Sequence, residues 1–116
     1  MQILRTVPNI FSHNLAESRR FYETTLGYRV VMDLDWIVTF ASPTSSAVQL
    51  SVLSKDPSGH QPTVSVEVDD VDAAYTEMQN GRFEVVYLLN AEPWGVRRFF
   101  VRDPAGTLVN VVSHAR

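Results

Sequence analysis

Hydrophobic and polar residues alternate along eight short stretches of the chain, which is the pattern of half-buried β-strands. Residues 63–68 (TVSVEV) alternate most strictly, with valines on one face and Thr, Ser and Glu on the other. Pro8 lies within the first stretch and favours an edge position or a bulge there. The predicted strands are residues 3–11, 28–34, 36–41, 47–53, 63–68, 83–88, 96–102 and 107–113.

Two further stretches have the 3.6-residue spacing of helices. The first begins at Asn14, whose side chain can cap a helix, and ends before Gly27, a residue type that commonly follows a helix. The second begins at either Asp69 or Asp70 and ends at Asn80-Gly81. The order strand, helix and three strands therefore occurs twice.

The two copies can be aligned residue by residue, with Asn14 against Asp70 and the turn Ser42-Pro43 against Asp103-Pro104. A repeat of this length predicts an α+β fold of two βαβββ modules whose open sheets pack together, because one half alone leaves a sheet face exposed. Within one domain of residues 1–116, we expect module one at 1–54, a polar linker at 55–62 and module two at 63–116.

Composition removes several functional classes. The 10 Lys and Arg residues against 13 Asp and Glu residues give a net charge of −3, which is atypical of nucleic-acid binding. The absence of cysteine excludes disulfides, thiolate metal sites and cysteine nucleophiles. No apolar run reaches the roughly 20 residues that span a bilayer, and the first residues do not resemble a signal peptide. We therefore expect a cytoplasmic protein without nucleic-acid or membrane partners.

Three motifs carry a family resemblance: residues 14–22 (NLAESRRFY) followed by 26–28 (LGY), residues 66–74 (VEVDDVDAA), and residues 93–108 (PWGVRRFFVRDPAGTL). Together they resemble the glyoxalase / bleomycin-resistance / extradiol-dioxygenase superfamily, also called vicinal oxygen chelate proteins. The resemblance implies two βαβββ modules that form curved mixed sheets around a cleft. It does not imply one activity, because the fold hosts isomerases, dioxygenases, transferases and binding proteins.

Within the superfamily, the chain is most similar to the bleomycin-resistance type. Residues 7–10 (VPNI), 33–36 (DLDW) and 94–95 (WG) carry this similarity. Those proteins form dimers with exchanged modules, hold a drug in clefts between the modules, and do no chemistry. The resemblance therefore implies a homodimer that binds a small organic ligand.

The resemblance also locates the metal ligands of the superfamily's enzymes, which are usually His, Gln or Glu. The four matching positions here are Val7, Ser51, Thr63 and Asn110, with Gln49 replacing Ser51 if the alignment slips. Valine cannot bind a metal, and hydroxyls and a neutral amide are poor ligands for transition metals. We therefore expect no bound metal and no other cofactor.

Alternation along the strands predicts which side chains line a binding cleft. Their aromatic rings, amides and hydroxyls suit a flat neutral or cationic organic molecule better than a phosphate. Trp94 could stack on such a ligand or anchor its loop by packing, and both interpretations stay open. The predicted ligand-binding residues are Asn9, Phe11, Gln49, Ser51, Ser65, Glu67, Trp94, Phe100 and Asn110.

Three hypotheses about function follow. The first is a metal-independent protein that binds and sequesters a small molecule, such as an antibiotic. The second is a glyoxalase-like isomerase or lyase, or another enzyme with a non-standard site. Glu67 is the weak candidate for the catalytic base of such an enzyme. The alternative for Glu67 is that it pairs with an arginine. The third is a protein–protein module. His13, His60 and His114 share no predicted strand face, and we expect them to be solvated.

Overall fold

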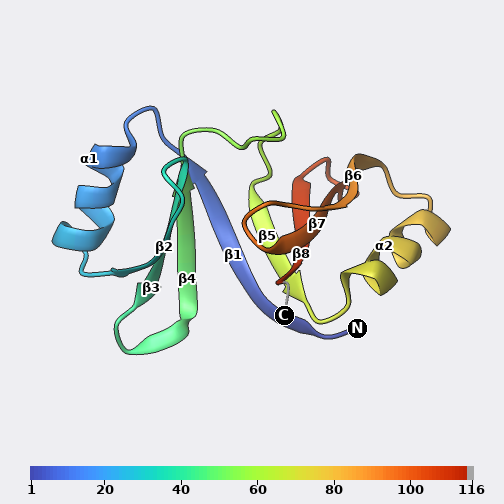
Figure 1. The fold of residues 1–116 in the computed structure, drawn as a ribbon, viewed down its shortest axis with the longest axis horizontal. Coiled ribbons are helices and arrows are strands. Elements are labelled where there is room, and N and C mark those ends of the chain that lie inside the picture. The colour runs from blue at the N-terminus through green and yellow to red at the C-terminus, as the bar shows by residue number, and fades with distance from the viewer. Residues whose placement is uncertain (115–116) are drawn as a thin grey trace. The chain divides into compact units, whose positions relative to one another are not determined.

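The computed structural model describes residues 1–114 and has the mixed α+β fold that the repeat predicts (Figure 1). Each module contributes a helical segment and four strands, and hydrogen-bonded neighbours follow the order β2-β3-β4-β1-β5-β8-β7-β6. The elements are β1 (Ile3–Phe11), α1 (Leu15–Arg19), η1 (Arg20–Thr25), β2 (Arg29–Asp33), β3 (Ile37–Ser42), β4 (Ser45–Leu53), β5 (Val64–Val68), α2 (Val71–Asn80), β6 (Val85–Ala91), β7 (Val96–Arg102) and β8 (Leu108–His114).

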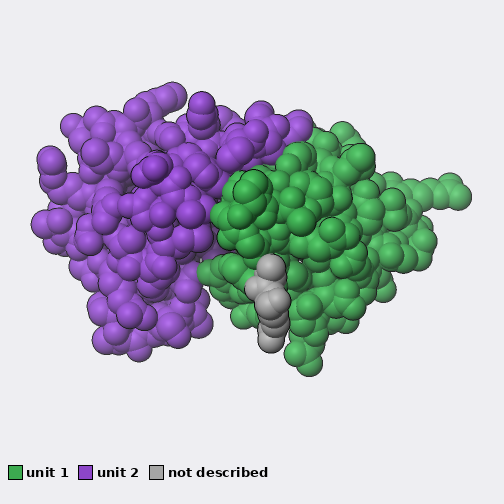
Figure 2. All heavy atoms as spheres, in the orientation of Figure 1, with its two compact units in different colours: residues 1–6, 62–116 green, residues 7–61 purple. Residues whose placement is uncertain are grey.

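The chain divides into two compact units (Figure 2). The N-terminal unit contains residues 7–61, and the C-terminal unit contains residues 1–6 together with 62–116. Strand β1 therefore contributes its first residues to the C-terminal unit and its remaining residues to the N-terminal unit.

The N-terminal unit packs one face of its sheet against its helical segment. Strand β1 runs parallel to β4, and β4, β3 and β2 are antiparallel neighbours. Val38, Phe40 and Val52 are buried, and Leu15 and Tyr22 from the helical segment pack against them. Every second residue of β3 and β4 therefore points towards the helix, as the alternation predicts.

The C-terminal unit repeats this arrangement. Strand β5 runs parallel to β8, and β8, β7 and β6 are antiparallel neighbours. Val68, Phe99 and Val111 from the strands form a buried core with Val71 and Ala74 of α2. The other face of this sheet, opposite α2, is called here the helix-free face of the C-terminal unit.

The two helices begin with the same cap. The side chain of Asn14 accepts a hydrogen bond from the backbone N–H of Glu17 at 3.1 Å, and that of Asp70 accepts one from Ala73 at 3.0 Å. The backbone angles are −138° and 89° at Asn14, and −136° and 89° at Asp70. Of the two predicted caps of α2, the structure therefore selects Asp70 over Asp69.

The first helix is less regular than its sequence predicts. Only Leu15–Arg19 is α-helical, and Arg20–Thr25 continues as a wider π-helix. The backbone N–H of Leu26 donates to the carbonyl of Phe21, five residues back, which is the π-helical bond. Gly27 then takes a φ of +89°, as expected for a residue that ends a helix. No helix within residues 1–114 is long and apolar enough to cross a membrane.

Strand β6 is displaced from its predicted position. It covers Val85–Ala91, whereas the alternation predicts residues 83–88. The chain needs extra residues to leave α2, because Arg82 takes a φ of +58° and the backbone N–H of Phe83 still donates to a carbonyl of the helix. The connection between β6 and β7 consequently covers only residues 92–95.

Candidate functional site

Polar and aromatic side chains cross the helix-free face of the C-terminal unit in one row. Ser65 of β5 lies beside Asn110 of β8, Asn110 lies beside Phe100 of β7, and Phe100 lies beside Tyr87 of β6. The alternation predicts this face for Ser65, Phe100 and Asn110. Thr63, the position implied by the family resemblance, is exposed and precedes β5, so Ser65 is the residue that pairs with Asn110.

Asn110 is buried, and within the described residues only one end of its side-chain amide is hydrogen-bonded. Its Nδ2 donates to the Ser65 hydroxyl at 2.9 Å. Its Oδ1 is buried and has no hydrogen-bond partner in the part of the chain that the structure describes. The residue as a whole is only 8% exposed. Buried acceptors are nearly always satisfied, so this oxygen is an exception among the described residues.

Glu67 lies on the same face and joins three strands. Its Oε1 accepts a hydrogen bond from Arg5 Nε of β1 at 2.7 Å, and its Oε2 contacts Nδ1 of His114 at the end of β8. Because an ionised carboxylate only accepts, the Nδ1 of His114 carries the proton in this contact. Burial raises the pKa of Glu67, but the hydrogen bonds from His114 and Arg5 outweigh it and hold the pKa below its ordinary value.

Sequence reasoning left open whether Glu67 acts as a base or pairs with an arginine. In the structure, Glu67 pairs with Arg5. His114 is exposed, in line with the expectation that the histidines are solvated, but its contact with Glu67 was not foreseen. His114 lies an even number of residues after Asn110 along β8, so the two side chains point to the same face of the sheet. This even spacing was a signal that could have placed His114 on the same face as Glu67.

A buried ion pair lies further along the face. Arg98 of β7 donates from Nε to Oε2 of Glu92 at 2.7 Å, and the side chains are only 4% and 9% exposed. The guanidinium carbon lies 4.9 Å from the ring of Trp94, 4.7 Å from Phe100 and 5.4 Å from Tyr87. The Tyr87 hydroxyl also donates to Glu92 at 3.1 Å. Trp94 therefore contacts Arg98, and its stacking on a ligand stays a prediction.

The N-terminal unit has its own helix-free face. Asn9 lies beside Ser51, and Phe11 lies next along the same face of β1. The hydroxyls of Ser51 and Thr39 are hydrogen-bonded at 2.7 Å, and both residues are buried. Gln49 lies two residues before Ser51 on β4 and therefore on the same face, and its side-chain amide donates a hydrogen bond to a backbone carbonyl. These four predicted residues therefore share the face that the alternation assigns to them.

Comparison with known proteins identifies the family. The model of the glyoxalase/bleomycin resistance protein/dioxygenase superfamily matches residues 2–111. The chain belongs to this superfamily. A comparison with curated proteins gave no match.

Solved structures of other superfamily members share the fold. A member from Vibrio splendidus 12B01 is 18% identical with a TM-score of 0.70, over 97% of this chain and 99% of that one. A methylmalonyl-CoA epimerase from Streptomyces coelicolor is 20% identical with a TM-score of 0.73, over 98% and 96%. The 2,3-dioxygenase LapB from Pseudomonas sp. KL28 is 14% identical with a TM-score of 0.69, over 95% and 42%. At these identities the similarity shows the fold alone.

The side chains at the superfamily's metal positions do not fit a transition metal. Val7 is apolar and 4% exposed, the Ser51 hydroxyl is bonded to Thr39, and Thr63 lies outside the strand. Asn110 offers a neutral amide oxygen. Within residues 1–114, no three His, Cys, Asp or Glu side chains come together in a way that could hold a metal ion. A tight site needs several imidazole, thiolate or carboxylate ligands.

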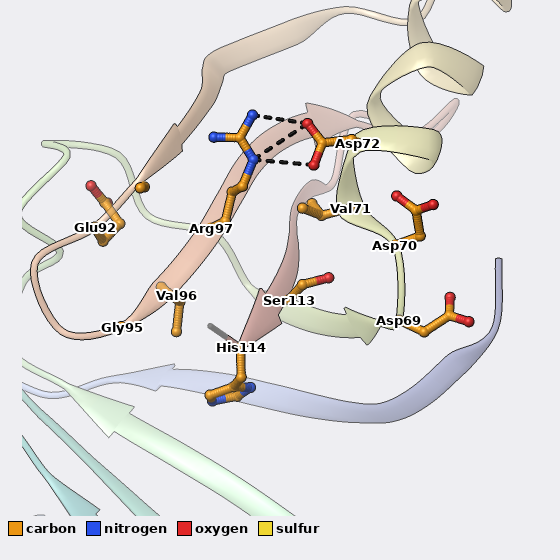
Figure 3. A pocket seen from close by; sticks show the side chains of 11 residues that line it. Asp69, Asp70, Val71, Asp72, Glu92, Gly95, Val96, Arg97, Ser113 and His114 are labelled. Carbon is orange, nitrogen blue, oxygen red and sulfur yellow. Dashed lines mark hydrogen bonds and ion pairs between the residues drawn. The ribbon is translucent and has the colours of Figure 1, made fainter. Parts of the chain in front are cut away.

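A separate pocket of about 290 Å³ lies in the C-terminal unit, at the start of α2 (Figure 3). Its carboxylates are already used by the fold: Asp72 pairs with Arg97 at 2.8 Å, Asp70 caps α2, and Asp69 accepts from the backbone N–H of Gln2 at 2.7 Å. None of the predicted ligand-binding residues lines it. The lining residues are Asp69, Asp70, Val71, Asp72, Ala91, Glu92, Gly95, Val96, Arg97, Ser113 and His114.

Proposed function

We propose that this superfamily member is a metal-independent binding protein of the bleomycin-resistance-like type, which binds and sequesters a small organic molecule. The observation that carries the proposal is the set of side chains at the superfamily's metal positions. Val7, Ser51, Thr63 and Asn110 provide no imidazole or carboxylate. The helix-free faces instead offer amides, hydroxyls and apolar surface, which suit the binding of an organic molecule.

The state of Glu67 disfavours the enzyme alternative. A glyoxalase-like isomerase, lyase or epimerase that works without a metal needs a base whose pKa lies near the working pH. Glu67 is the one carboxylate that the alternation offers for this role, and its pKa is held low by Arg5 and His114. A carboxylate stabilised in this way is a weak base.

The test begins with the metal content of protein purified without chelators, measured by elemental mass spectrometry. We expect no stoichiometric metal and an unchanged melting temperature after treatment with EDTA. About one metal ion per chain, lost together with stability on chelation, would overturn the proposal, since a bound metal stabilises the folded state. The enzyme alternative would then lead, and hemithioacetals and catechols would be the first substrates to assay.

Ligand binding is tested on the same metal-free protein with a panel of flat aromatic antibiotics. We expect saturable binding and recovery of the unchanged compound after incubation. Turnover of a bound compound would contradict sequestration. Substituting Glu67→Gln separates the alternatives, because an enzyme that uses this carboxylate as a base loses its rate while its fold persists.

We propose further that the protein is a cytoplasmic homodimer. The lack of cysteine suits a reducing compartment. Several large apolar side chains of the N-terminal unit are exposed, including Phe21 at 50%, Leu26 at 56% and Val48 at 52%. A second copy that covered such side chains would remove them from water. Light scattering should give twice the chain mass, and a monomer at micromolar concentration would contradict this proposal.

A further inference from the structure

We propose that residues 1–6 form an acid-sensitive strap, which two carboxylates of the C-terminal unit hold along β5 and which detaches in acid before that unit unfolds. The carboxylates belong to Glu67 in β5 and to Asp69, which directly follows β5. Three features support this role: the strap buries few side chains, its printed contacts converge on the two carboxylates, and both contacts favour the ionised form of the carboxylate.

The strap buries little apolar surface. All of its side chains except that of Arg5 are exposed. Its two aliphatic residues, Ile3 and Leu4, are 66% and 47% exposed. Burial begins with the next residue, Val7, which is 4% exposed and belongs to the N-terminal unit. A segment with few buried apolar contacts opens at a small cost in free energy, so polar contacts decide how firmly the strap is held.

The polar contacts lie at two points. Near the end of the strap, Arg5 Nε donates to Oε1 of Glu67 at 2.7 Å. Near its start, the backbone N–H of Gln2 donates to Oδ1 of Asp69 at 2.7 Å, and the backbone N–H of Asp69 donates to the carbonyl of Gln2 at 3.1 Å. Figure 3 shows the start of the chain, in blue, ending beside Asp69. Hydrogen bonds to an ionised acceptor are stronger than bonds between neutral groups, so the attachment depends on the charge of both carboxylates.

Glu67 faces two basic side chains, Arg5 from the strap and His114 from β8. Burial raises the pKa of Glu67, and the hydrogen bonds from His114 and Arg5 outweigh this effect and hold the pKa below its ordinary value. When the strap leaves, Glu67 loses one of these two donors. Its pKa is therefore lower with the strap bound than with the strap detached.

Asp69 responds in the same direction. The hydrogen bond from the backbone N–H of Gln2 is the main cause of its lowered pKa, and the amino group of Met1 adds a weaker attraction. A carboxylate whose pKa is lowered by a contact stabilises that contact above its ordinary pKa, here 4.5 for Glu67 and 3.8 for Asp69. This stabilisation is lost as the pH falls through the lowered values, so acid weakens both contacts together.

Detachment changes the sheet edge as well. Strand β1 is the neighbour of β5 on the side opposite β8. Release of the strap therefore leaves backbone N–H and C=O groups of β5 unpaired, and an open strand edge promotes pairing with another chain. The strap thus makes the cover of this edge dependent on pH.

The test is amide hydrogen exchange of the full chain, followed by NMR between pH 6 and pH 3 and corrected for the intrinsic exchange rate at each pH. The reporter is the backbone N–H of Asp69, which donates to the strap. The reference is the backbone N–H of Thr63, which donates to Leu108 at 3.0 Å within the same unit. We expect the protection of Asp69 to fall about tenfold or more while that of Thr63 changes little, since about tenfold corresponds to one hydrogen bond to a charged group.

Two results of this titration would overturn the proposal. Protection of Asp69 that stays constant down to pH 3 would show that the strap does not respond to acid. Equal losses at Asp69 and Thr63 at the same pH would show that the strap opens only when the unit unfolds. Neither result bears on ligand binding, so the proposed function is tested separately.

A variant tests at pH 7 whether the two contacts act as one strap. Glu67→Gln removes the charge at one contact and leaves Asp69 ionised, and we expect it to lower the protection of the Asp69 amide about tenfold. Glu84→Gln is the matched control, because its carboxylate also faces an arginine of the same unit, Arg102 at 3.7 Å, and does not contact the strap. Full protection of Asp69 in Glu67→Gln would show that the two contacts open separately and would overturn the proposal. If Glu67→Gln does not fold, the acid titration of the unaltered chain decides alone.

Discussion

The buried pair of Arg98 and Glu92 allows a quantitative prediction about stability. The substitution Arg98→Met keeps most of the side-chain length and the apolar contacts with the surrounding rings, but it removes the charge. Glu92 is then left 9% exposed with the Tyr87 hydroxyl as its remaining donor in the known contacts. Removing one partner of a buried ion pair costs about 3–5 kcal/mol, because the other charge stays buried without compensation.

This magnitude is large for a chain of 116 residues. A domain of this size has a free energy of unfolding of about 6–17 kcal/mol. Each kcal/mol shifts the melting temperature of such a domain by about 3–6 °C, so Arg98→Met should melt about 9–30 °C lower than the unaltered protein. The loss of three ring contacts with the guanidinium adds to the effect.

The assay is thermal and urea unfolding followed by circular dichroism, with a double-mutant cycle. We expect Arg98→Met and Glu92→Gln each to be strongly destabilising. The double variant should be much more stable than the sum of the two predicts, because it leaves no unpaired charge. Arg97→Met is the matched control on the same strand. Its pair with Asp72 is exposed, and the substitution should change the melting temperature little.

Two results would refute this reasoning. If Arg98→Met melts within a few degrees of the unaltered protein, the pair is solvated and the buried-charge argument fails. If the effects of Arg98→Met and Glu92→Gln simply add, the two side chains do not depend on each other, and the loss in each variant has another cause.

Two further predictions concern Glu67 and the cap of α2. The pKa of Glu67 is held below its ordinary value of 4.5 in the folded state, so its stabilising effect is present above about pH 4.5 and is lost as the pH falls through the folded-state pKa. Glu67→Gln should therefore lower the free energy of unfolding by about 1–2 kcal/mol at pH 7, and urea titrations should show this difference shrinking towards pH 3. Asp70→Ala should cost about 1 kcal/mol in the same assay, because the cap of α2 is lost, whereas Thr76→Ala on the exposed side of α2 should cost less.

The regular elements could be predicted because their side chains alternate between a helix-covered face and the opposite face. The alternation of Val64, Val66 and Val68 predicted strand β5 and the face of β5 that α2 covers. The starts of the two helices were predicted from the capping residues Asn14 and Asp70. The predicted end of α2 was close but chemically different. Gly81 has a φ of −75°, and Arg82 is the residue that adopts the left-handed conformation. A Cβ at position 81 would lie 2.6 Å from the Phe83 ring, so any other residue would require that ring to move.

Sequence reasoning predicted which side chains share a face of the sheet, but it did not predict which charged side chains pair with each other. Parity alone places Ser65, Glu67 and Asn110 on one side of the sheet, since it depends only on position within a strand. The partner of Arg98 depends on the register between β6 and β7, and two irregularities between Val85 and Asn90 set that register. Alternation carries no information about such shifts, so the buried ion pair could not be predicted from it.

The division of β1 between the two units has a practical consequence for experiments on fragments. A protease cut within residues 54–61 would leave the first six residues covalently attached to the N-terminal fragment. Those residues nevertheless bond to the C-terminal unit, through Arg5 to Glu67 and through the backbone pairing of Gln2 with Asp69. The nicked protein should therefore stay associated and be suitable for labelling one half at a time. Residues 62–116 expressed alone lack that strand and begin with an uncovered β5 edge, which invites aggregation.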